Sequence, residues 1–280
     1  MKIVSIVTLF VALVISATLN AQSKDFKQTV DFPAGGDLRV KFDVSKVHLT
    51  SWERNQVEVI AHIEGRTNDH VSADYARRAV EATRIEMTGD ARSLTIKVNY
   101  DDVPYEEKWG GRNRVIPHID WEIRAPRHLN LDFEIDRSEA EIRGFEGKIK
   151  LQADRTPVRT EDLAGELRLE IDRGNESRLA NLRGSLNVNS DRTNLIFERL
   201  QITGDSRIEI DRGNLEMRVS GNQGMVVSMN KERRSEFKSD FAITTNGIHD
   251  DKFEGAINGG GPKLAIHSDR KSTRLNSSHG

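Results

Sequence analysis

Five seven-residue stretches that end in Asp-Arg decide the fold of this chain: LDFEIDR (131–137), IKLQADR (149–155), LRLEIDR (167–173), LNVNSDR (186–192) and SRIEIDR (206–212). Their Asp residues recur at steps of 18, 18, 19 and 20 residues. Glycines tend to close each unit: Gly147, Gly165, Gly184, Gly204 and Gly221. Self-similarity at such a period is typical of stacked units, none of which can bury its apolar face alone.

Apolar and polar residues alternate before each Asp-Arg pair, as at Leu167, Leu169 and Ile171. This pattern predicts short β-strands, each followed by a turn. A β-sandwich would have a similar density of strands, but it would not explain the constant phase of Asp-Arg. We therefore predict an all-β fold, a β-helix-like β-solenoid with coils of about 18–20 residues, in one domain over residues 22–268.

Stacking such coils would place the Asp and Arg residues in adjacent ladders: Asp136, Arg137, Asp154, Arg155, Asp172, Arg173, Asp191, Arg192, Asp211 and Arg212. Aligned like charges repel, so we expect each Asp to pair with the Arg of a neighbouring coil. The Gly or Asn that follows is expected to adopt the positive φ of the corner. The structural ladder has two alternatives, a flat surface for a glycan with periodic acidic groups and a site for a divalent cation.

The segment before the repeats has the same alternation, with Leu38, Val40, Phe42 and Val44 on one face. Residues 72–87 differ, because Tyr75, Ala76, Ala79, Val80 and Thr83 share one helical face after a candidate N-cap at Ser72. We predict one amphipathic helix there, packed over an end or side of the sheet structure.

An irregular insertion over residues 101–117 interrupts the alternation. Four of the six Trp and Tyr residues lie at or near it: Tyr100, Tyr105, Trp109 and Trp121. Aromatic and Arg side chains on a loop that a rigid scaffold holds often form carbohydrate or peptide sites. We predict a binding site at Tyr105, Trp109, Arg112 and Arg114; the alternative is a loop that caps an open end of the solenoid.

The N-terminus predicts export. Lys2 precedes an almost wholly apolar stretch over residues 3–15, and Ala21 offers a cleavage site. This is the layout of a signal peptide over residues 1–21, with an uncleaved anchor as the alternative. No later stretch is apolar enough to span a membrane. Cysteine is absent, and the 42 Lys and Arg residues balance 44 Asp and Glu residues, so we expect no thiol chemistry and no nucleic-acid partner.

The C-terminal segment, residues 269–280, includes DRKSTRLNSSH, which matches one reading frame of a common sequencing-library adapter. We expect this segment to be adapter translation and not native. Asp269 lies 58 residues after Asp211, close to three repeat periods, so a native Asp-Arg pair at that point or a genuine polar tail is the alternative.

No catalytic constellation emerges from the sequence. The histidines have no metal-ligand spacing, and none lies in a nucleophile motif. We therefore expect no enzyme activity, no cofactor and no metal.

Several of these features resemble the bacterial putative-adhesin domains of unknown function. They are the apparent signal peptide, the strands over residues 38–49 followed by Trp52, the helix over residues 72–87, and two late turn segments, 244–247 and 257–261. The resemblance covers roughly residues 28–268. It implies a β-helix-like domain on a secreted or envelope protein and no catalytic residues. This chain departs from the family at its corners, where it carries Asp-Arg-Gly-Asn in place of Ser-Asn-Gly.

The expected function is that of a periplasmic, cell-surface or secreted protein with a binding or structural role. Its partner would be an envelope glycan or a surface protein. A carbohydrate-active β-helix enzyme and an accessory or sensor protein of the envelope stress response are the alternatives.

Overall fold

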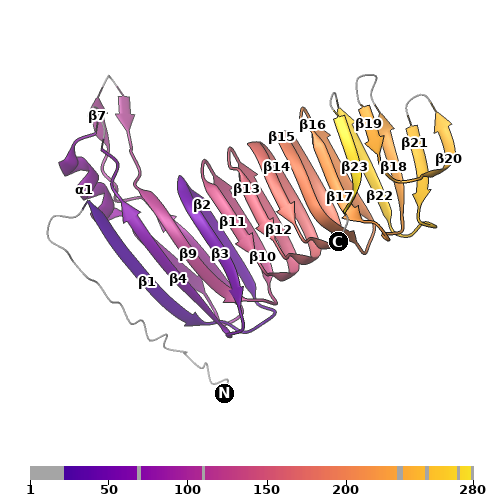
Figure 1. Ribbon diagram of the computed structural model, residues 1–280. Coiled ribbons are helices and arrows are strands. Elements are labelled where there is room, and N and C mark those ends of the chain that lie inside the picture. The colour runs from indigo at the N-terminus through magenta and orange to yellow at the C-terminus, as the bar shows by residue number, and fades with distance from the viewer. Residues whose placement is uncertain are drawn as a thin grey trace, which may run out of the picture.

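The computed structural model describes residues 22–67, 71–108, 111–231, 236–249, 252–269 and 272–278. Within these residues the chain is all-β with one helix, which confirms the all-β part of the predicted fold class (Figure 1). The expected signal peptide, residues 1–21, lies outside the described residues. None of the described helices is long and apolar enough to cross a membrane.

The first ladder of parallel strands contains the Asp-Arg stretches. Its members are β2 (Asp37–Asp43), β10 (Asn130–Asp136), β12 (Glu146–Asp154), the first half of β14 (Ala164–Ala180), the first half of β15 (Arg183–Ile202) and β16 (Ser206–Asp211). The register places like residues opposite one another, so that Asp136 faces Asp154 and Asp172 faces Asp191. Asp43, which has no Arg after it, aligns with Asp136 and begins the series.

A second parallel ladder follows each corner. It contains β3 (Ser45–Trp52), β11 (Glu139–Arg143), β13 (Val158–Glu161), the second halves of β14 and β15, and β17 (Leu215–Ser220). Because β14 and β15 pass through the corner without a break, the described strands of both ladders join in one open 21-stranded sheet. Figure 1 shows these strands side by side along one axis.

Further strands, in both parallel and antiparallel pairing, extend both ends of the sheet. At the N-terminal end, β9 (His118–Pro126), β4 (Gln56–Glu64) and β1 (Ser23–Asp31) continue from β3, while β6 (Ser93–Asn99) and β5 (Arg84–Gly89) continue from β2. At the other end lie β18 (Met225–Lys231), β19 (Glu236–Ser239), β20 (Thr244–His249), β21 (Lys252–Ile257), β22 (Lys263–Asp269) and β23 (Ser272–Ser278). The expectation that residues 269–280 are not native stays a prediction, because any short alternating segment can occupy a strand position such as β23.

The inward side chains of both ladders form one hydrophobic core. Trp121 is fully buried there, and its ring stacks on that of Phe42 with the ring centroids 3.9 Å apart. Its indole N–H donates to the Ser45 hydroxyl, which satisfies the polar atom of the buried ring. Trp121 is therefore a core residue and not part of the aromatic cluster of the insertion.

The corners differ from the expectation in one respect. The positive φ falls on the Arg itself, from 49° at Arg137 to 56° at Arg212. Gly174 and Gly213 do not have it, whereas Asn175, with φ of 57°, has it as expected. In this conformation the Arg137 N–H donates to the Asp154 carbonyl and the Arg155 N–H to the Asp172 carbonyl, so the ladder continues through the corner. The hydrogen bond offsets the steric cost of a left-handed non-glycine residue.

A buried hydroxyl follows several of these corner residues. Ser138 and Thr156 each donate to the carbonyl of the Asp two residues before, and the Thr156 hydroxyl accepts the Ser138 N–H of the preceding coil. The Ser138 hydroxyl accepts the Ser45 N–H in the same way. These hydroxyls satisfy backbone groups that the turn would otherwise leave unpaired.

Val44 occupies the corner position that Arg occupies in later coils, with φ of 52°, so the alternation expected through Val44 ends at Phe42. A β-branched residue is a steric outlier in this region. Val44→Gly is therefore expected to raise the free energy of unfolding by about 1 kcal/mol. Chemical denaturation would measure it, with Val44→Thr, which keeps the β-branch, as the unchanged control. An equal gain in both variants would contradict the strain at this corner.

The helix α1 (Ala73–Ala82) is shorter than predicted. Its N-cap is Ser72, as expected, and the Ser72 hydroxyl accepts the Tyr75 N–H. Thr83 ends the helix in an extended conformation, with its hydroxyl donating to the Ala79 carbonyl. The remainder of the predicted helix belongs to β5, where antiparallel pairing with β6 overrides the helical pattern.

Candidate functional site

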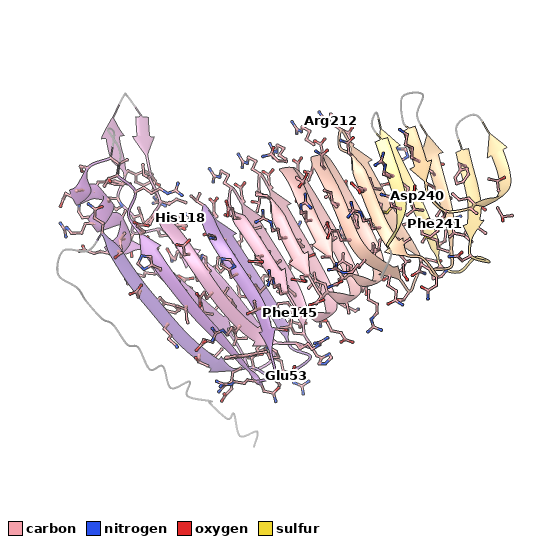
Figure 2. The ribbon with its side chains drawn as sticks, in the orientation of Figure 1. Glu53, His118, Phe145, Arg212, Asp240 and Phe241 are labelled. Carbon is pink, nitrogen blue, oxygen red and sulfur yellow. The ribbon has the colours of Figure 1, made fainter. Side chains whose placement is uncertain are left out.

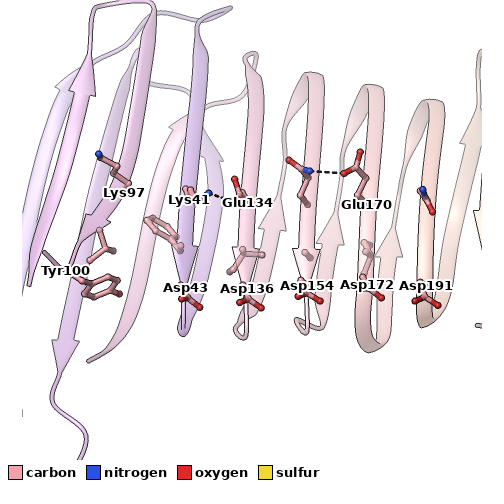
Figure 3. Close-up of a pocket in the computed structure, with 17 residues that line it drawn as sticks. Lys41, Asp43, Lys97, Tyr100, Glu134, Asp136, Asp154, Glu170, Asp172 and Asp191 are labelled. Atoms are coloured by element: carbon pink, nitrogen blue, oxygen red, sulfur yellow. Dashed lines mark hydrogen bonds and ion pairs between the residues drawn. The ribbon is translucent and has the colours of Figure 1, made fainter. Parts of the chain in front are cut away.

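A groove of about 810 Å³ lies on the outer face of the first ladder. It runs across the strands from β6 to β15 (Figure 3). The floor lies at inward-facing residues such as Ile135 and Ala153. Because side chains alternate along a strand, the outward residues on either side of each floor residue form two walls.

We call one side the mixed wall: Lys97, Lys41, Glu134, Gln152, Glu170 and Asn189, which are consecutive partners in the register. Lys41 donates to Glu134 over 2.6 Å, and the Gln152 amide donates to Glu170 over 2.7 Å (Figure 3). Burial would raise the pKa of Glu170, but hydrogen bonds from Arg168 and Gln152 outweigh it and leave the pKa below its ordinary value. Glu170 is therefore ionised at neutral pH.

The opposite side is the Asp wall: Asp43, Asp136, Asp154, Asp172 and Asp191. Arg side chains approach several of these carboxylates from the corner side. Arg155 Nη2 lies 2.8 Å from Asp136, and Arg173 Nη2 lies 2.7 Å from Asp154. In each case the Arg of one coil reaches back to the Asp of the coil before.

This pairing is interrupted at Asp172. The next Arg in the series, Arg192, contacts Asp191 of its own coil, over 3.0 Å, instead of reaching back. An irregularity in the pairing of β14 with β15 lies at this point, between Asp172 and Asn175. A bulge re-aims neighbouring side chains, which accounts for the missing contact.

Two carboxylate oxygens of the Asp wall have no donor, one on Asp172 at the interruption and one on Asp191, whose other oxygen accepts from Arg192 and Arg212. Among the described residues, six buried side-chain polar atoms have no hydrogen-bond partner, and three of them line this groove: Tyr100 Oη, Asp172 Oδ1 and Asp191 Oδ1. Burial raises the pKa of Tyr100, and the charge of Asp43 raises it further, so the hydroxyl keeps its proton. A buried polar atom without a partner is costly, and a ligand that supplies one recovers that cost.

The predicted site on the insertion lies apart from the groove walls. Tyr105 is 53% exposed, and the Arg114 guanidinium lies 4.5 Å from the centre of its ring. Arg112 lies in β8 (Gly111–Asn113), which pairs with β7 (Glu106–Lys108) in a separate hairpin. Trp109 lies outside the described residues. The structure thus brings Tyr105 and Arg114 together and leaves the binding role of the four residues a prediction.

Helix α1 supports the base of this hairpin. The Tyr75 hydroxyl donates to the Pro104 carbonyl over 2.7 Å and accepts the Val115 N–H over 3.0 Å. Tyr75 also packs with Val103 in a small hydrophobic cluster separate from the main core. In Figure 1 the hairpin projects beside α1 beyond the sheet.

Within the described part of the chain, no group of three or more His, Cys, Asp or Glu residues is placed to hold a metal ion. Charged side chains project from the sheet along its length, with Arg212 at one margin and Glu53 at the other (Figure 2). Sequence reasoning named four of the five Asp residues of the Asp wall as a ladder, but it missed Asp43 and the mixed wall. In the sequence, the mixed wall is visible only as the polar residues of the alternating pattern, and any strand with one solvent-facing side has such residues.

These observations define the class of protein: an all-β chain with a long polar groove across parallel strands. The chain matches no family model, and no curated protein matches it. Three solved structures are similar to it at a TM-score of 0.30, each over 91% of this chain.

The first is a putative cell adhesion protein from Clostridium sporogenes, 9% identical and covered over 100% of its length. The others are putative adhesins from Bacteroides fragilis (8% identical) and Parabacteroides merdae (7% identical), each covered over 97% of its length. These neighbours carry the same kind of description, adhesin or cell adhesion protein, as the family that the sequence resembles. Their structural similarity to this chain is too low to support a conclusion about function.

Proposed function

We propose that this chain is an exported β-solenoid of the cell envelope that binds an extended ligand in the groove between the mixed wall and the Asp wall. Export is supported by the N-terminal pattern of Lys2, the apolar residues 3–15 and Ala21. The solenoid is supported by the in-register parallel pairing of successive coils in both ladders.

The single observation that carries the binding role is the set of three unpartnered polar atoms in one groove. A protein with a purely structural role gains nothing from leaving Asp172 Oδ1, Asp191 Oδ1 and Tyr100 Oη without partners on the same surface. All three atoms belong to residues that line the groove but are themselves buried, so a ligand laid along it would reach them once their side chains rotate.

A carbohydrate-active enzyme is the alternative that a groove with carboxylates raises. A glycosidase needs a general acid with a raised pKa opposite a second carboxylate. The pKa of Glu170 is lowered, and Glu134 is paired with Lys41, so neither suits the role of the acid. The proposal is therefore a binder, and we expect no release of reducing ends from envelope polysaccharides.

An array of envelope glycans, peptidoglycan fragments and peptides would test this proposal with the full exported chain. Tyr100→Phe is the decisive variant, because the lost hydroxyl has no partner within the described fold and the ring remains. We expect this variant to fold normally and to lose binding. Thr160→Val is the matched control, since it removes another unpartnered buried hydroxyl outside the groove.

A second variant separates the groove from the hairpin. Tyr105→Ala combined with Arg114→Ala removes the ring and the guanidinium that lie together there. Binding lost in this variant but kept in Tyr100→Phe would assign recognition to the hairpin and overturn the groove proposal.

A further inference from the structure

The strand β1 is the outermost strand at the N-terminal end of the sheet (Figure 1), and β4 is its only partner among the described strands. At one end of this antiparallel ladder the Gly65 N–H donates to the Gln22 carbonyl, and at the other the Phe32 N–H donates to the Asn55 carbonyl. Alternate residues of an antiparallel strand bond to the same neighbour. The even-numbered residues of β1 therefore bond to β4, and the odd-numbered residues direct their N–H and C=O groups to a free edge.

The odd-numbered residues also carry the outward side chains of β1, two of which are charged and well exposed. Asp25 is 73% exposed and Lys27 is 60% exposed. Within the chain, Asp25 bonds to His62 and Lys27 to Glu58. A carboxylate has several acceptor sites and an ammonium group several donors, so both side chains can take a further partner.

The hydrophobic core is open at this end. Phe26 points inward and is only partly buried, as are Ile85 and Met87 of β5 at the end of the first ladder. The exposed end of a stacked core needs a cover. From the coil of β10 and β11, the register runs to β1 through β3, β9 and β4 but to β5 through β2 and β6 only, so β1 projects one strand further. Helix α1 lies at the Ser23 end of β1 and leaves the rest of its edge open (Figure 1).

Charged residues on an edge strand usually prevent pairing with another copy, and in most registers of β1 they would do so. Two copies that pair about a two-fold axis must place odd-numbered residues opposite odd-numbered residues, so the axis passes through a residue. An axis at Asp25 or at Lys27 brings two identical charges together, and an axis at Gln28 brings Asp25 opposite Asp31. Like charges that face each other are unfavourable. An axis at Thr29 pairs opposite charges, but it leaves the first residues of β1 unpaired.

An axis at Phe26 avoids this repulsion. It places Asp25 of each copy opposite Lys27 of the other, and it pairs residues 23–29 of both strands. Opposite charges across a pair of strands are stabilising. The two Phe26 rings meet at the axis, where they cover the open end of the core.

We propose that two copies of this chain form a dimer through β1, paired antiparallel about a two-fold axis at Phe26. The second ladders of both copies then continue as one sheet, and the interface closes after two copies because its two halves are the same surface. This surface is separate from the groove, which lies on the first ladder. The dimer is expected to form with or without a ligand in the groove.

Analytical ultracentrifugation of the full exported chain over a series of concentrations would test this proposal. We expect an equilibrium between monomer and dimer and no larger species. Lys27→Asp and Asp25→Lys each place like charges opposite each other at both symmetric positions, so each variant should raise the dissociation constant of the dimer by about tenfold. Asp31→Lys, which lies on the same edge outside the paired residues, should dimerise as the unaltered chain does.

An exchange of both charges separates the dimer from effects within one copy. A variant with Asp25→Lys and Lys27→Asp loses the ion pairs with His62 and Glu58, but it restores opposite charges between the copies. We expect its dissociation constant to return to within about threefold of that of the unaltered chain. A double variant that dimerises as weakly as the single variants would contradict the proposed pairing.

Single cysteines would read the register, because the chain has no cysteine of its own. Phe26→Cys faces the same residue of the other copy in the proposed register, at about 5 Å between the Cβ atoms, which is close to the separation that a disulfide needs. Gln28→Cys faces Lys24 and is the matched control. Oxidised glutathione should therefore cross-link the Phe26→Cys variant into a covalent dimer and leave the Gln28→Cys variant monomeric on a non-reducing gel.

Three results would overturn the proposal: a monomer at every concentration, a series of species larger than a dimer, or equal cross-linking of both cysteine variants. Loss of the dimer in Asp31→Lys would place the axis at Thr29 and overturn the register at Phe26. None of these results changes the binding expected in the groove, which the Tyr100→Phe variant tests.

Discussion

Gly165→Ala is expected to lower the free energy of unfolding by about 3 kcal/mol or more, because the added methyl group collides with the neighbouring coil. Gly165 has φ of +115°, and a Cβ there would lie 2.2 Å from the carbonyl oxygen of Gly147. Gly147, Gly165 and Gly184 are consecutive partners in the first ladder. The atom in the way belongs to the backbone of a stacked strand, so a rotamer change cannot relieve the contact.

Gly221→Ala is the matched control for this experiment. Gly221 also ends a coil, but a Cβ there would have no atom within 4 Å, and its φ is not in the left-handed region. We expect its free energy of unfolding to stay within about 0.5 kcal/mol of that of the unaltered chain. Urea denaturation would measure both variants. Similar stability of the two would show that the coils separate easily and that the glycines do not set their distance.

Leu169→Ala is the second large effect, with an expected loss of about 2–5 kcal/mol in the free energy of unfolding. Leu169 is 1% exposed and lies in the core between Leu151 and Val188, its partners on neighbouring strands. Truncation leaves a cavity that the strands cannot close, because each is held by backbone hydrogen bonds on both sides.

Arg173→Ala measures how much the Asp-Arg ladder contributes to stability, for comparison with the core residue Leu169 of the same coil. Arg173 bridges Asp154 and Asp172 at the corner, and its side chain is 42% exposed. Solvent screens such a pair, so we expect a much smaller loss than for Leu169→Ala. The same denaturation experiment would compare the two variants. Equal losses would mean that the core has been assigned to the wrong residues or that the charge ladder dominates stability.

The core could be predicted from the sequence because it depends on local alternation. Leu167, Leu169 and Ile171 are inward and buried, as the period of two requires. The buried face of α1 also follows from spacing alone, and Tyr75 and Ala79 lie on it. Such features need no information on which strands become neighbours.

Features that depend on neighbours were predicted less well. The positive φ at Arg155 is stabilised by a carbonyl from the next coil, and the helix ends at Thr83 because β6 offers a partner to the residues that follow. Local propensity alone would place the positive φ at Gly or Asn and would continue the helix beyond Thr83. In both cases hydrogen bonds between distant segments outweigh preferences of a fraction of a kcal/mol to about 1 kcal/mol per residue.

The sequence by itself determined the all-β class, the stacking period and the inward face of each strand, since a repeated pattern of two-residue alternation has few other solutions. Only the tertiary structure decided the groove. Its first rungs join residues 93 positions apart, such as Lys41 and Glu134, and one of its unpartnered oxygens, Asp172 Oδ1, lies where a bulge interrupts the ladder. Which outward side chains become neighbours, and which of them stay unpaired, depends on the register between strands, and register is a property of the folded sheet.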